Sequence, residues 1–295
     1  MVEVSSKPMS PNPQGALPPA PTLREALTLA AIAGLPVLEA RMLLSHVTGF
    51  TRTQLITRDN DHLDAPKRDA FATLLARRLT GEPMAYLIGE REFFGRTFRV
   101  TPDVLIPRPD TEVAAEASLA RIADVKAPRV LDMGTGSGIL AVTIARERPD
   151  ADVWATDISR GALMVAEDNA RALQADNIRF LVSDWYEDLP VGLCFNLIVS
   201  NPPYIAEGDP HLVEGDLRFE PIDALTDHED GLSDLATIVA GATARLLPGG
   251  WLLMEHGYDQ GAAMRAQLAE AGFVEVFTSR DLAGLERCSG GRLPG

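Results

Sequence analysis

The run Asn201-Pro202-Pro203-Tyr204 comes directly after the apolar segment 195–199, and its residue types suit it to grip an NH2 group. Neither proline has an N–H, and the residue before a proline is held extended, so a strand ending here ends in hydrogen-bond acceptors. The side-chain carbonyl of Asn201 and the backbone carbonyl of Pro202 can hold the N–H bonds of an amide while its lone pair points outward. Tyr204 adds a flat face for the planar group. We predict that Asn201, Pro202 and Tyr204 are catalytic and that the whole run binds the substrate; the alternative is a proline-rich turn with a core tyrosine.

A second run, Gly134-Thr135-Gly136-Ser137-Gly138, lies between a predicted buried strand at 129–133 and a predicted helix at 139–148. Three glycines allow the backbone to come close to a ligand at the carboxyl end of that strand. The third glycine of a dinucleotide fingerprint would stand where Ile139 is, which disfavours NAD, and no Gly-Lys-Ser/Thr follows, which disfavours a nucleotide triphosphate. We expect these five residues to bind a cofactor.

Two further predicted strands end in residues that suit an adenosine. The strand 153–157 ends in Asp157, an acid placed to bind the two hydroxyls of a ribose. The strand 178–182 is followed by Asp184 and Trp185, an acid and an aromatic ring suited to the amino group and the face of an adenine. Taken one at a time these residues are ordinary turns or caps. Their order after successive strands predicts an adenosine ligand without a phosphate clamp.

Together these motifs resemble a class I S-adenosylmethionine-dependent methyltransferase that acts on amino or amide nitrogens. The flanking sequence is similar to the HemK/PrmC family, the protein-(glutamine) methyltransferases of peptide chain release factors, over about residues 23–287. The segments that carry this likeness are Gly81-Glu82-Pro83-Met84-Ala85-Tyr86-Leu87-Ile88-Gly89, Glu92-Phe93-Phe94-Gly95, Leu105-Ile106-Pro107-Arg108-Pro109-Asp110-Thr111-Glu112, Arg218-Phe219-Glu220-Pro221 and Glu255-His256-Gly257.

The resemblance implies S-adenosyl-L-methionine as cofactor and S-adenosyl-L-homocysteine as product. It implies methylation of the side-chain amide nitrogen of the glutamine in the Gly-Gly-Gln loop of class 1 release factors. Arg108 and Thr111 would then lie beside the cofactor, and Arg218 and Glu220 would shape the substrate mouth. The alternatives are a surface ion pair for Arg108, a helix cap for Thr111, and a brace for the loop after Tyr204.

Composition sets limits on partners and compartment. The 295 residues carry a formal net charge of −15, and residues 22–100 hold 11 Lys and Arg against 9 Asp and Glu, so the excess of acid lies in the remainder. A polyanion is bound by neutralising its phosphates, so this charge disfavours a nucleic-acid substrate. The two cysteines, 194 and 288, lack metal-ligand spacing, which predicts free thiols, no metal site and a reducing cytoplasm. No segment predicts a membrane span or a secretory signal, and we expect a monomer.

Alternating strands and helices predict an α/β fold, a doubly wound and mostly parallel seven-stranded Rossmann-like sheet. We divide the chain into a disordered proline-rich lead at 1–21, a helical substrate-docking domain at 22–88, a linking β-hairpin at 89–105 and the methyltransferase domain at 106–295. Apolar residues at three- and four-residue spacing predict helices at 23–33, 37–47 and 67–80 in the helical domain, and we expect a helix at about 231–246 and a turn at 248–250 in the methyltransferase domain. The resemblance implies that the last strand, near 285–292, runs antiparallel. Two other functions stay open: an adenine or cytosine amino methyltransferase acting on nucleic acid, and a non-catalytic protein that binds S-adenosylmethionine.

Overall fold

The computed structural model describes residues 17–295 and divides the chain into two compact units, one ending at Ile88 and one spanning Gly89–Gly295. Most of the predicted disordered lead lies outside the described residues. Its last five residues differ from the prediction, because Pro21 is buried and the Arg68 guanidinium donates a hydrogen bond to the Pro19 carbonyl at 2.7 Å. The described part of the first unit therefore begins to pack before residue 22.

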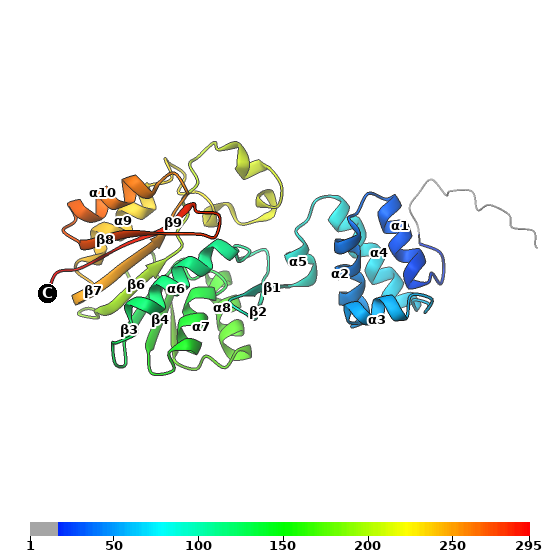
Figure 1. The fold of residues 1–295 in the computed structure, drawn as a ribbon, viewed down its shortest axis with the longest axis horizontal. Coiled ribbons are helices and arrows are strands. Elements are labelled where there is room, and N and C mark those ends of the chain that lie inside the picture. Colours follow the sequence, from blue (N-terminus) through cyan, green and yellow to red (C-terminus); the bar gives the residue numbers. More distant parts are fainter. Residues whose placement is uncertain (1–16) are drawn as a thin grey trace, which may run out of the picture. The chain divides into compact units, whose positions relative to one another are not determined.

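The first unit is a group of helices whose ends follow from their capping residues (Figure 1). Thr22 and Thr51 each begin a helix with a capping box, in which the threonine and the third helical residue satisfy each other's backbone N–H groups. Gly49, with a left-handed φ of 71°, ends another helix. Between residues 17 and 88 the helices are α1 (Leu23–Ile32), α2 (Val37–Thr48), α3 (Arg52–Thr57), α4 (Ala65–Leu79) and α5 (Met84–Ile88). The helices predicted at 23–33, 37–47 and 67–80 are confirmed within two residues at each end, whereas α3 and α5 are too short to give a periodic pattern.

The second unit contains the predicted mostly parallel sheet. Among the described residues the sheet has seven strands in the order β5-β4-β3-β6-β7-β9-β8, and only β9 runs antiparallel to its neighbours. The strands are β3 (Arg129–Met133), β4 (Asp152–Asp157), β5 (Ile178–Val182), β6 (Phe195–Ser200), β7 (Leu246–Glu255), β8 (Val274–Arg280) and β9 (Glu286–Arg292). The predicted fold class and the antiparallel last strand are confirmed.

Helices cover both faces of this sheet (Figure 1). The helices are α6 (Glu112–Arg121), α7 (Ile139–Glu147), α8 (Arg160–Ala172), α9 (Ser233–Ala242) and α10 (Gly261–Glu270), with 3-10 turns η1 (Pro109–Thr111), η2 (Pro210–Val213), η3 (Leu217–Phe219) and η4 (Ile222–Ala224). Side chains that alternate along β7 enter different cores, because Leu253 packs with the cluster under α6 and α7, whereas Leu252 and Met254 pack with the cluster under α9 and α10.

The predicted hairpin consists of β1 (Glu90–Phe93) and β2 (Arg96–Arg99), joined by the two-residue turn Phe94-Gly95. Both turn residues have positive φ, 50° and 69°, as a tight hairpin turn requires. The hairpin ends at residue 99, short of the predicted residue 105. Its backbone is held at Arg99 by Asn169 on α8, whose side chain also donates to the Ser137 carbonyl at 2.8 Å. One asparagine thus joins the hairpin to the glycine loop.

Two predictions near the end of the chain are wrong in detail. The turn predicted at 248–250 is part of β7, which begins at Leu246 and pairs with β6 through a register shift between Phe195 and Leu197. A left-handed Gly249 lets the strand pass through this irregularity without ending. The helix predicted at 231–246 is the shorter α9, because Asp227 accepts backbone N–H groups from Gly231 and Ser233 and holds the chain in a loop before the helix begins.

Candidate active site

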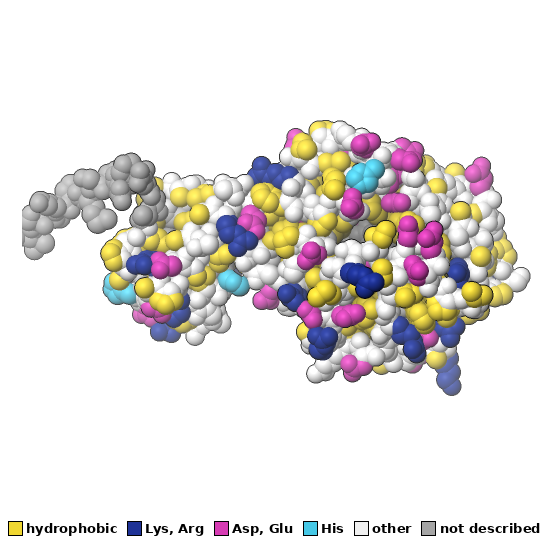
Figure 2. Space-filling model, turned by 180° about the vertical axis from the view of Figure 1, so that it is seen from behind, with side chains coloured by type: hydrophobic (Ala, Val, Ile, Leu, Met, Phe, Trp, Pro, Cys, Tyr) yellow, Lys and Arg dark blue, Asp and Glu magenta, His cyan; other side chains and the backbone are white. Residues whose placement is uncertain are grey.

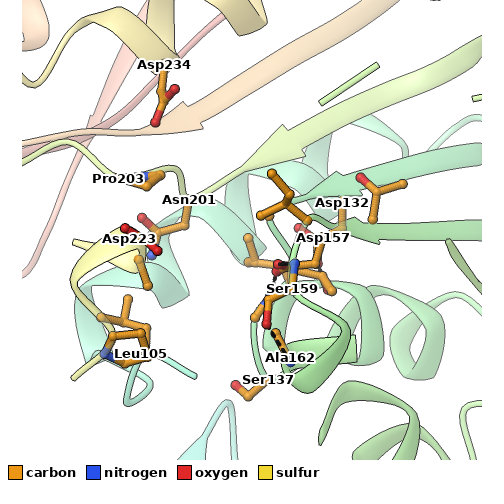
Figure 3. Close-up of a pocket in the computed structure, with 18 of the residues that line it drawn as sticks. Leu105, Asp132, Ser137, Asp157, Ser159, Ala162, Asn201, Pro203, Asp223 and Asp234 are labelled. Carbon is orange, nitrogen blue, oxygen red and sulfur yellow. Dashed lines mark hydrogen bonds between the residues drawn. The ribbon is translucent and has the colours of Figure 1, made fainter. Parts of the chain in front are cut away.

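The parallel strands β3, β4, β5 and β6 end at a cavity of about 420 Å³ (Figure 3). This volume lies within the roughly 300–1,000 Å³ of small-molecule sites. The predicted site residues that line it are Arg108, Thr111, Gly134, Thr135, Gly136, Ser137, Asp157, Asp184, Trp185, Asn201 and Pro203. The predicted site residues that do not line it are Gly138, Pro202, Tyr204, Arg218 and Glu220. Figure 3 shows Asp157 and Ser159 on one side of the cavity and Asn201, Pro203 and Asp223 on the other.

The glycine loop after β3 needs all three of its glycines in the left-handed region. Gly134, Gly136 and Gly138 have φ values of 66°, 55° and 82°, which side-chain-bearing residues rarely adopt. A Cβ on Gly138 would also lie 3.0 Å from the Ala166 Cβ, so this glycine allows the loop to pack against α8. The first two line the cavity. Gly138 is therefore a packing residue, while Gly134 and Gly136 form the wall.

Asp157, at the end of β4, ties this loop to the next strand. Its two carboxylate oxygens accept the backbone N–H groups of Gly136 and Ser159, each at 2.9 Å. Burial raises the pKa of Asp157, and these two hydrogen bonds oppose the rise. Each carboxylate oxygen can accept more than one hydrogen bond, so Asp157 can still receive hydroxyl groups from the cavity.

Asp132 is a second acid of the cavity that the sequence reasoning missed. Its Oδ2 accepts hydrogen bonds from the Thr135 hydroxyl at 2.6 Å and the Ala141 N–H at 3.0 Å. Its Oδ1 is buried and has no partner among the described residues, although the residue lines the cavity. Burial raises the pKa of Asp132 to about 7. The signal in the sequence was an acid inside an apolar strand, which places a carboxyl where water cannot solvate it.

Trp185 and Asp184, which the sequence predicts to bind an adenine, both line the cavity. The Trp185 ring is 3.8 Å from the point where a Cβ on Gly134 would lie, so the ring packs beside the glycine loop. Asp234, at the start of α9, also lines the cavity, and burial together with the charges of Asp227 and Asp184 raises its pKa. The sequence reasoning did not identify Asp234, because α9 begins far along the chain from the motifs.

Asn201 reaches the cavity from the end of β6 with one side of its amide already engaged. The Asn201 Nδ2 donates to the Thr111 hydroxyl at 3.3 Å. The Asn201 side-chain oxygen accepts no hydrogen bond from the described residues, and the neighbouring Pro202 and Pro203 have no N–H to offer. This oxygen can therefore accept a hydrogen bond from a ligand. The backbone beyond is held by Gln260, whose Nε2 donates to the Tyr204 carbonyl at 2.9 Å and to the Gly231 carbonyl at 3.1 Å.

Tyr204 differs from the sequence prediction. Its ring packs with the core cluster under α9 and α10 and does not line the cavity, and its hydroxyl donates to the Glu255 carboxylate at 3.3 Å. Burial raises the pKa of this phenol well above its usual range. The structure therefore favours a supporting role for Tyr204 behind the strand end, in place of the predicted stacking face.

Arg108 and Glu220 form an ion pair with each other, with the Glu220 carboxylate fully buried. The other carboxylate oxygen of Glu220 accepts the Ile106 N–H at 2.9 Å. Glu220 therefore joins the loop after Tyr204, for which the sequence left open a brace, to the segment before η1, and it does not line the cavity. Arg218 is exposed, with its guanidinium 4.9 Å from the centre of the Phe219 ring, and lies outside the cavity lining.

The surface around the cavity carries many carboxylates. Asp103, Asp223 and Asp227 line it in addition to the acids already described. Figure 2 shows Asp and Glu side chains (magenta) spread over the visible surface of the second unit. Within residues 17–295, no group of three or more His, Cys, Asp or Glu side chains has an arrangement that could hold a metal ion. In the same part of the chain, every helix is too short or too polar to cross a membrane.

The cavity fits S-adenosylmethionine by the chemistry of its residues. Asp132 presents a buried oxygen without a partner, which suits a positively charged amino group. The Asp157 carboxylate suits the hydroxyls of a ribose. The left-handed glycines present a wall of backbone without side chains, which suits the part of the ligand that links the ribose to sulfur. Trp185 and Asp184 suit an adenine. Acids predominate at these positions, and the sulfonium and amino groups of this cofactor are positive.

Comparison with known proteins assigns both parts of the chain. A family model described as PrmC N-terminal domain matches residues 23–89, and one described as Methyltransferase small domain matches residues 110–214. The solved structure of a T. thermophilus 16S rRNA methyltransferase, in complex with AdoMet and guanosine, is 24% identical and has a TM-score of 0.51, covering 69% of this chain and 49% of its own. This likeness shows a shared methyltransferase fold.

Closer relatives are found among curated sequences. A release factor glutamine methyltransferase of Burkholderia pseudomallei is 56% identical over 93% of this chain and 98% of its own length. Another, from Bordetella pertussis, is 57% identical over 90% of this chain and 98% of its own. Identity at this level over nearly the full length of both proteins confirms the resemblance found in the motifs. The chain belongs to the HemK/PrmC family of release factor glutamine methyltransferases.

Proposed function

We propose that this enzyme transfers the methyl group of S-adenosylmethionine to the side-chain amide nitrogen of the glutamine in the Gly-Gly-Gln loop of class 1 peptide chain release factors. The observation that carries this proposal is the Asn201 side chain at the end of β6. Its Nδ2 is bound to Thr111, so its carbonyl oxygen is the group left to accept a hydrogen bond from an amide NH2. Relatives that are 56% and 57% identical bear the name of this activity.

The residues at the strand end would orient the amide of the substrate. An amide nitrogen is a poor nucleophile because its lone pair is delocalised into the carbonyl group. Asn201 and the Pro202 backbone carbonyl would accept its two N–H bonds, which places the lone pair toward the cavity. The nitrogen would form a bond to the methyl carbon as the bond between that carbon and sulfur breaks with its electron pair left on sulfur, and the nitrogen would then give up one proton to solvent. Most of the rate enhancement would come from this positioning.

The cofactor would be held by the opposite wall of the cavity. Asp157 would accept the ribose hydroxyls, Trp185 and Asp184 would bind the adenine, and the wall at Gly134 and Gly136 would allow close approach. When bound, S-adenosylmethionine supplies a methyl group on a positive sulfonium, and S-adenosylhomocysteine is the product. We propose that no metal takes part, which can be checked by measuring methyl transfer after treatment with EDTA.

The charge of the site favours a protein substrate over a nucleic acid. Asp223, Asp227 and Asp234 line the cavity, and a phosphate backbone placed there would be repelled by their carboxylates. We further propose that residues 22–88 help to hold the release factor, a role supported by exposed apolar side chains such as Ile32, Leu38 and Ile56 in that unit. We also propose that the enzyme is a monomer and that it works in the cytoplasm, where release factors meet the ribosome.

The test is to incubate the enzyme with labelled S-adenosylmethionine and a recombinant class 1 release factor. A matched release factor has the Gly-Gly-Gln glutamine changed to alanine, and mass spectrometry locates the methyl group. Label on that glutamine alone is the expected result. Label on duplex DNA in a parallel reaction would favour an amino methyltransferase of nucleic acid, and tight cofactor binding without any product would favour a binding protein.

A further inference from the structure

The 3-10 turn η1, with the residue on either side of it, is a junction between four parts of the second unit. Its polar side chains share one property, since each contacts a different element of the fold. The contacts are Arg108 with Glu220 in the loop after Tyr204, Asp110 with Arg287 on β9, Thr111 with Asn201 at the end of β6, and Glu112 with the Phe94 N–H of the hairpin. The Asn201 side chain is therefore attached to a turn that other elements hold in place.

One of these contacts, between Asp110 and Arg287, lies outside the cavity lining at both ends. The Arg287 Nη2 is 3.1 Å from the Asp110 Oδ2, and neither residue lines the cavity. The Nε of the same guanidinium donates to the Asp281 Oδ2 at 2.8 Å. The Asp281 Oδ1 accepts the backbone N–H groups of Ala283 and Leu285, each at 2.9 Å. Arg287 therefore joins η1 to the turn between β8 and β9.

The chemistry of this pair suits a fixed distance between two segments. A guanidinium is a rigid, planar group whose N–H donors can bind two carboxylates at once, which a lysine ammonium on its flexible stem does less well. The Arg287 side chain is 18% exposed, so salt screens the pair less than it would screen a pair on the open surface. The Asp110 side chain is 42% exposed, so water can solvate an amide put in its place.

The position of Asp110 is passed on to Asn201 through printed hydrogen bonds of the turn. Thr111 follows Asp110 in the chain and is fully buried. Its backbone N–H donates to the Arg108 carbonyl at 3.2 Å, and the Glu112 N–H donates to the Asp110 carbonyl. These bonds make η1 one tight turn, so Asp110 and Thr111 move together. A shift at Asp110 therefore moves the hydroxyl that accepts the Asn201 Nδ2–H.

We propose that Asp110 and Arg287 are positioning residues for methyl transfer. Their ion pair holds η1 at the place where the Thr111 hydroxyl fixes the direction of the Asn201 amide. The inference rests on the proposed methylation of a glutamine amide, in which Asn201 accepts an N–H of the substrate. It assigns to neither residue of the pair a contact with substrate or cofactor. The pair would therefore affect turnover more than cofactor binding.

The first experiment removes the charge of Asp110 and keeps its size. We expect Asp110→Asn to lower kcat, at saturating release factor and S-adenosylmethionine, about 5-fold or more, the effect of a small displacement of an orienting group. Affinity for S-adenosylmethionine, measured by calorimetry, should change by less than about 3-fold, because the pair lies outside the cavity lining. The control is Glu275→Gln, which breaks an ion pair with Arg292 at the opposite end of β9 and should keep the wild-type kcat. Urea titration checks that each variant is folded.

A second background tests whether the effect runs through the Thr111 hydroxyl. Thr111→Val removes this hydroxyl at nearly constant volume and should itself lower kcat. Asp110→Asn should then change kcat by less than about 2-fold in the Thr111→Val background, because the contact on which it acts is already lost. A purely structural effect of Asp110→Asn would lower kcat by the same factor in both backgrounds.

Arg287→Gln tests the other half of the pair. This change breaks the contacts with both Asp110 and Asp281, so kcat should fall at least as far as in Asp110→Asn. Adding Asp110→Asn to Arg287→Gln should change kcat by less than about 2-fold, because the pair is already broken. Losses that multiply in the double variant would show that the two residues do not act as a pair.

The outcomes separate the inference from the proposed function. Wild-type kcat in Asp110→Asn, or an equal loss in the wild-type and Thr111→Val backgrounds, would overturn the inference and leave the proposed function intact. A loss of S-adenosylmethionine affinity large enough to explain the loss of activity would overturn it as well. Failure of the unaltered enzyme to methylate the release factor would contradict the proposed function and the inference with it.

Discussion

Gly136 and Gly138 are two residues apart in one loop, and an added methyl group would meet different surroundings at each. At Gly138 a Cβ would lie 3.0 Å from the Ala166 Cβ and 3.2 Å from its Cα, whereas at Gly136 nothing lies within 4 Å. Both residues have left-handed φ values, 82° and 55°. Substitution by alanine therefore brings backbone strain at both positions and a steric clash at only one.

The expected magnitudes follow from these two terms. A side-chain-bearing residue in the left-handed region costs about 1–2 kcal/mol, and an extra methyl group forced into a packed interior costs about 1–3 kcal/mol. Gly138→Ala should lower the free energy of unfolding by about 2–5 kcal/mol, and Gly136→Ala by about 1–2 kcal/mol. The ranking should reverse for the ligand, because Gly136 lines the cavity and Gly138 does not. A methyl group on that wall should weaken S-adenosylmethionine binding about 10-fold or more.

Urea titration followed by tryptophan fluorescence measures the first quantity. All three tryptophans, at 154, 185 and 251, lie in the second unit, so the signal reports the unfolding of the part that carries the loop. Calorimetry with S-adenosylmethionine, in buffer without urea, measures the second. Equal urea midpoints with equal slopes for the two variants would refute the role given to Ala166. Wild-type cofactor affinity in Gly136→Ala would refute the assignment of this residue to the ligand wall.

Three further predictions concern single side chains. Asn201→Ala should lower the turnover of release factor methylation by about 100-fold or more, as for loss of a preorganised polar contact, with a much smaller effect on cofactor affinity; wild-type turnover would remove Asn201 from the amide site. Asp157→Ala should weaken S-adenosylmethionine binding by roughly 1–3 kcal/mol, and calorimetry showing unchanged affinity would exclude the ribose role. Because this variant also frees the N–H groups of Gly136 and Ser159, its unfolding is measured in parallel. Glu255→Gln should stabilise the fold at high pH. Burial raises the Glu255 pKa from 4.5 to about 7, so the free energy of unfolding of the wild-type protein falls as the pH rises through this window, by about 3 kcal/mol in all. Urea titrations at pH 5 and pH 8 that give the same difference between variant and wild type would contradict this.

The sequence predicted the sheet well because strands and loops of this fold have local signals. Apolar runs bounded by glycine or acid located β3, β4, β5 and β6, and the alternation with helices predicted a parallel arrangement. The irregular start of β7 was missed, since Pro248, Gly249 and Gly250 read as a turn when the pairing with β6 is unknown. The start of β7 is set by its pairing with β6, and the residues of one segment alone do not show which strand it will pair with.

The candidate site divides in the same way. That Gly134, Gly136 and Asp157 come together could be predicted, because each lies at the end of a strand and parallel strands end at one edge. Asp132 was missed, because an acid inside an apolar strand indicates a buried carboxyl but does not indicate that it lines a cavity. The ring of Tyr204, which the sequence predicts to stack on the substrate amide, packs with the core cluster under α9 and α10. Its direction depends on the Glu255 carboxylate, which lies 51 residues further along the chain.

These differences bear on what the motif Asn-Pro-Pro-Tyr can specify. Neither proline of the motif has an N–H, so this part of the strand end offers backbone acceptors only, and that property belongs to the four residues themselves. The placement of its two polar side chains does not, because Asn201 donates to Thr111 in η1 and Tyr204 donates to Glu255 in β7. The backbone beyond the motif is held by Gln260, before α10. Three distant segments therefore hold the motif in place, and the proposed grip on a substrate amide depends on all three.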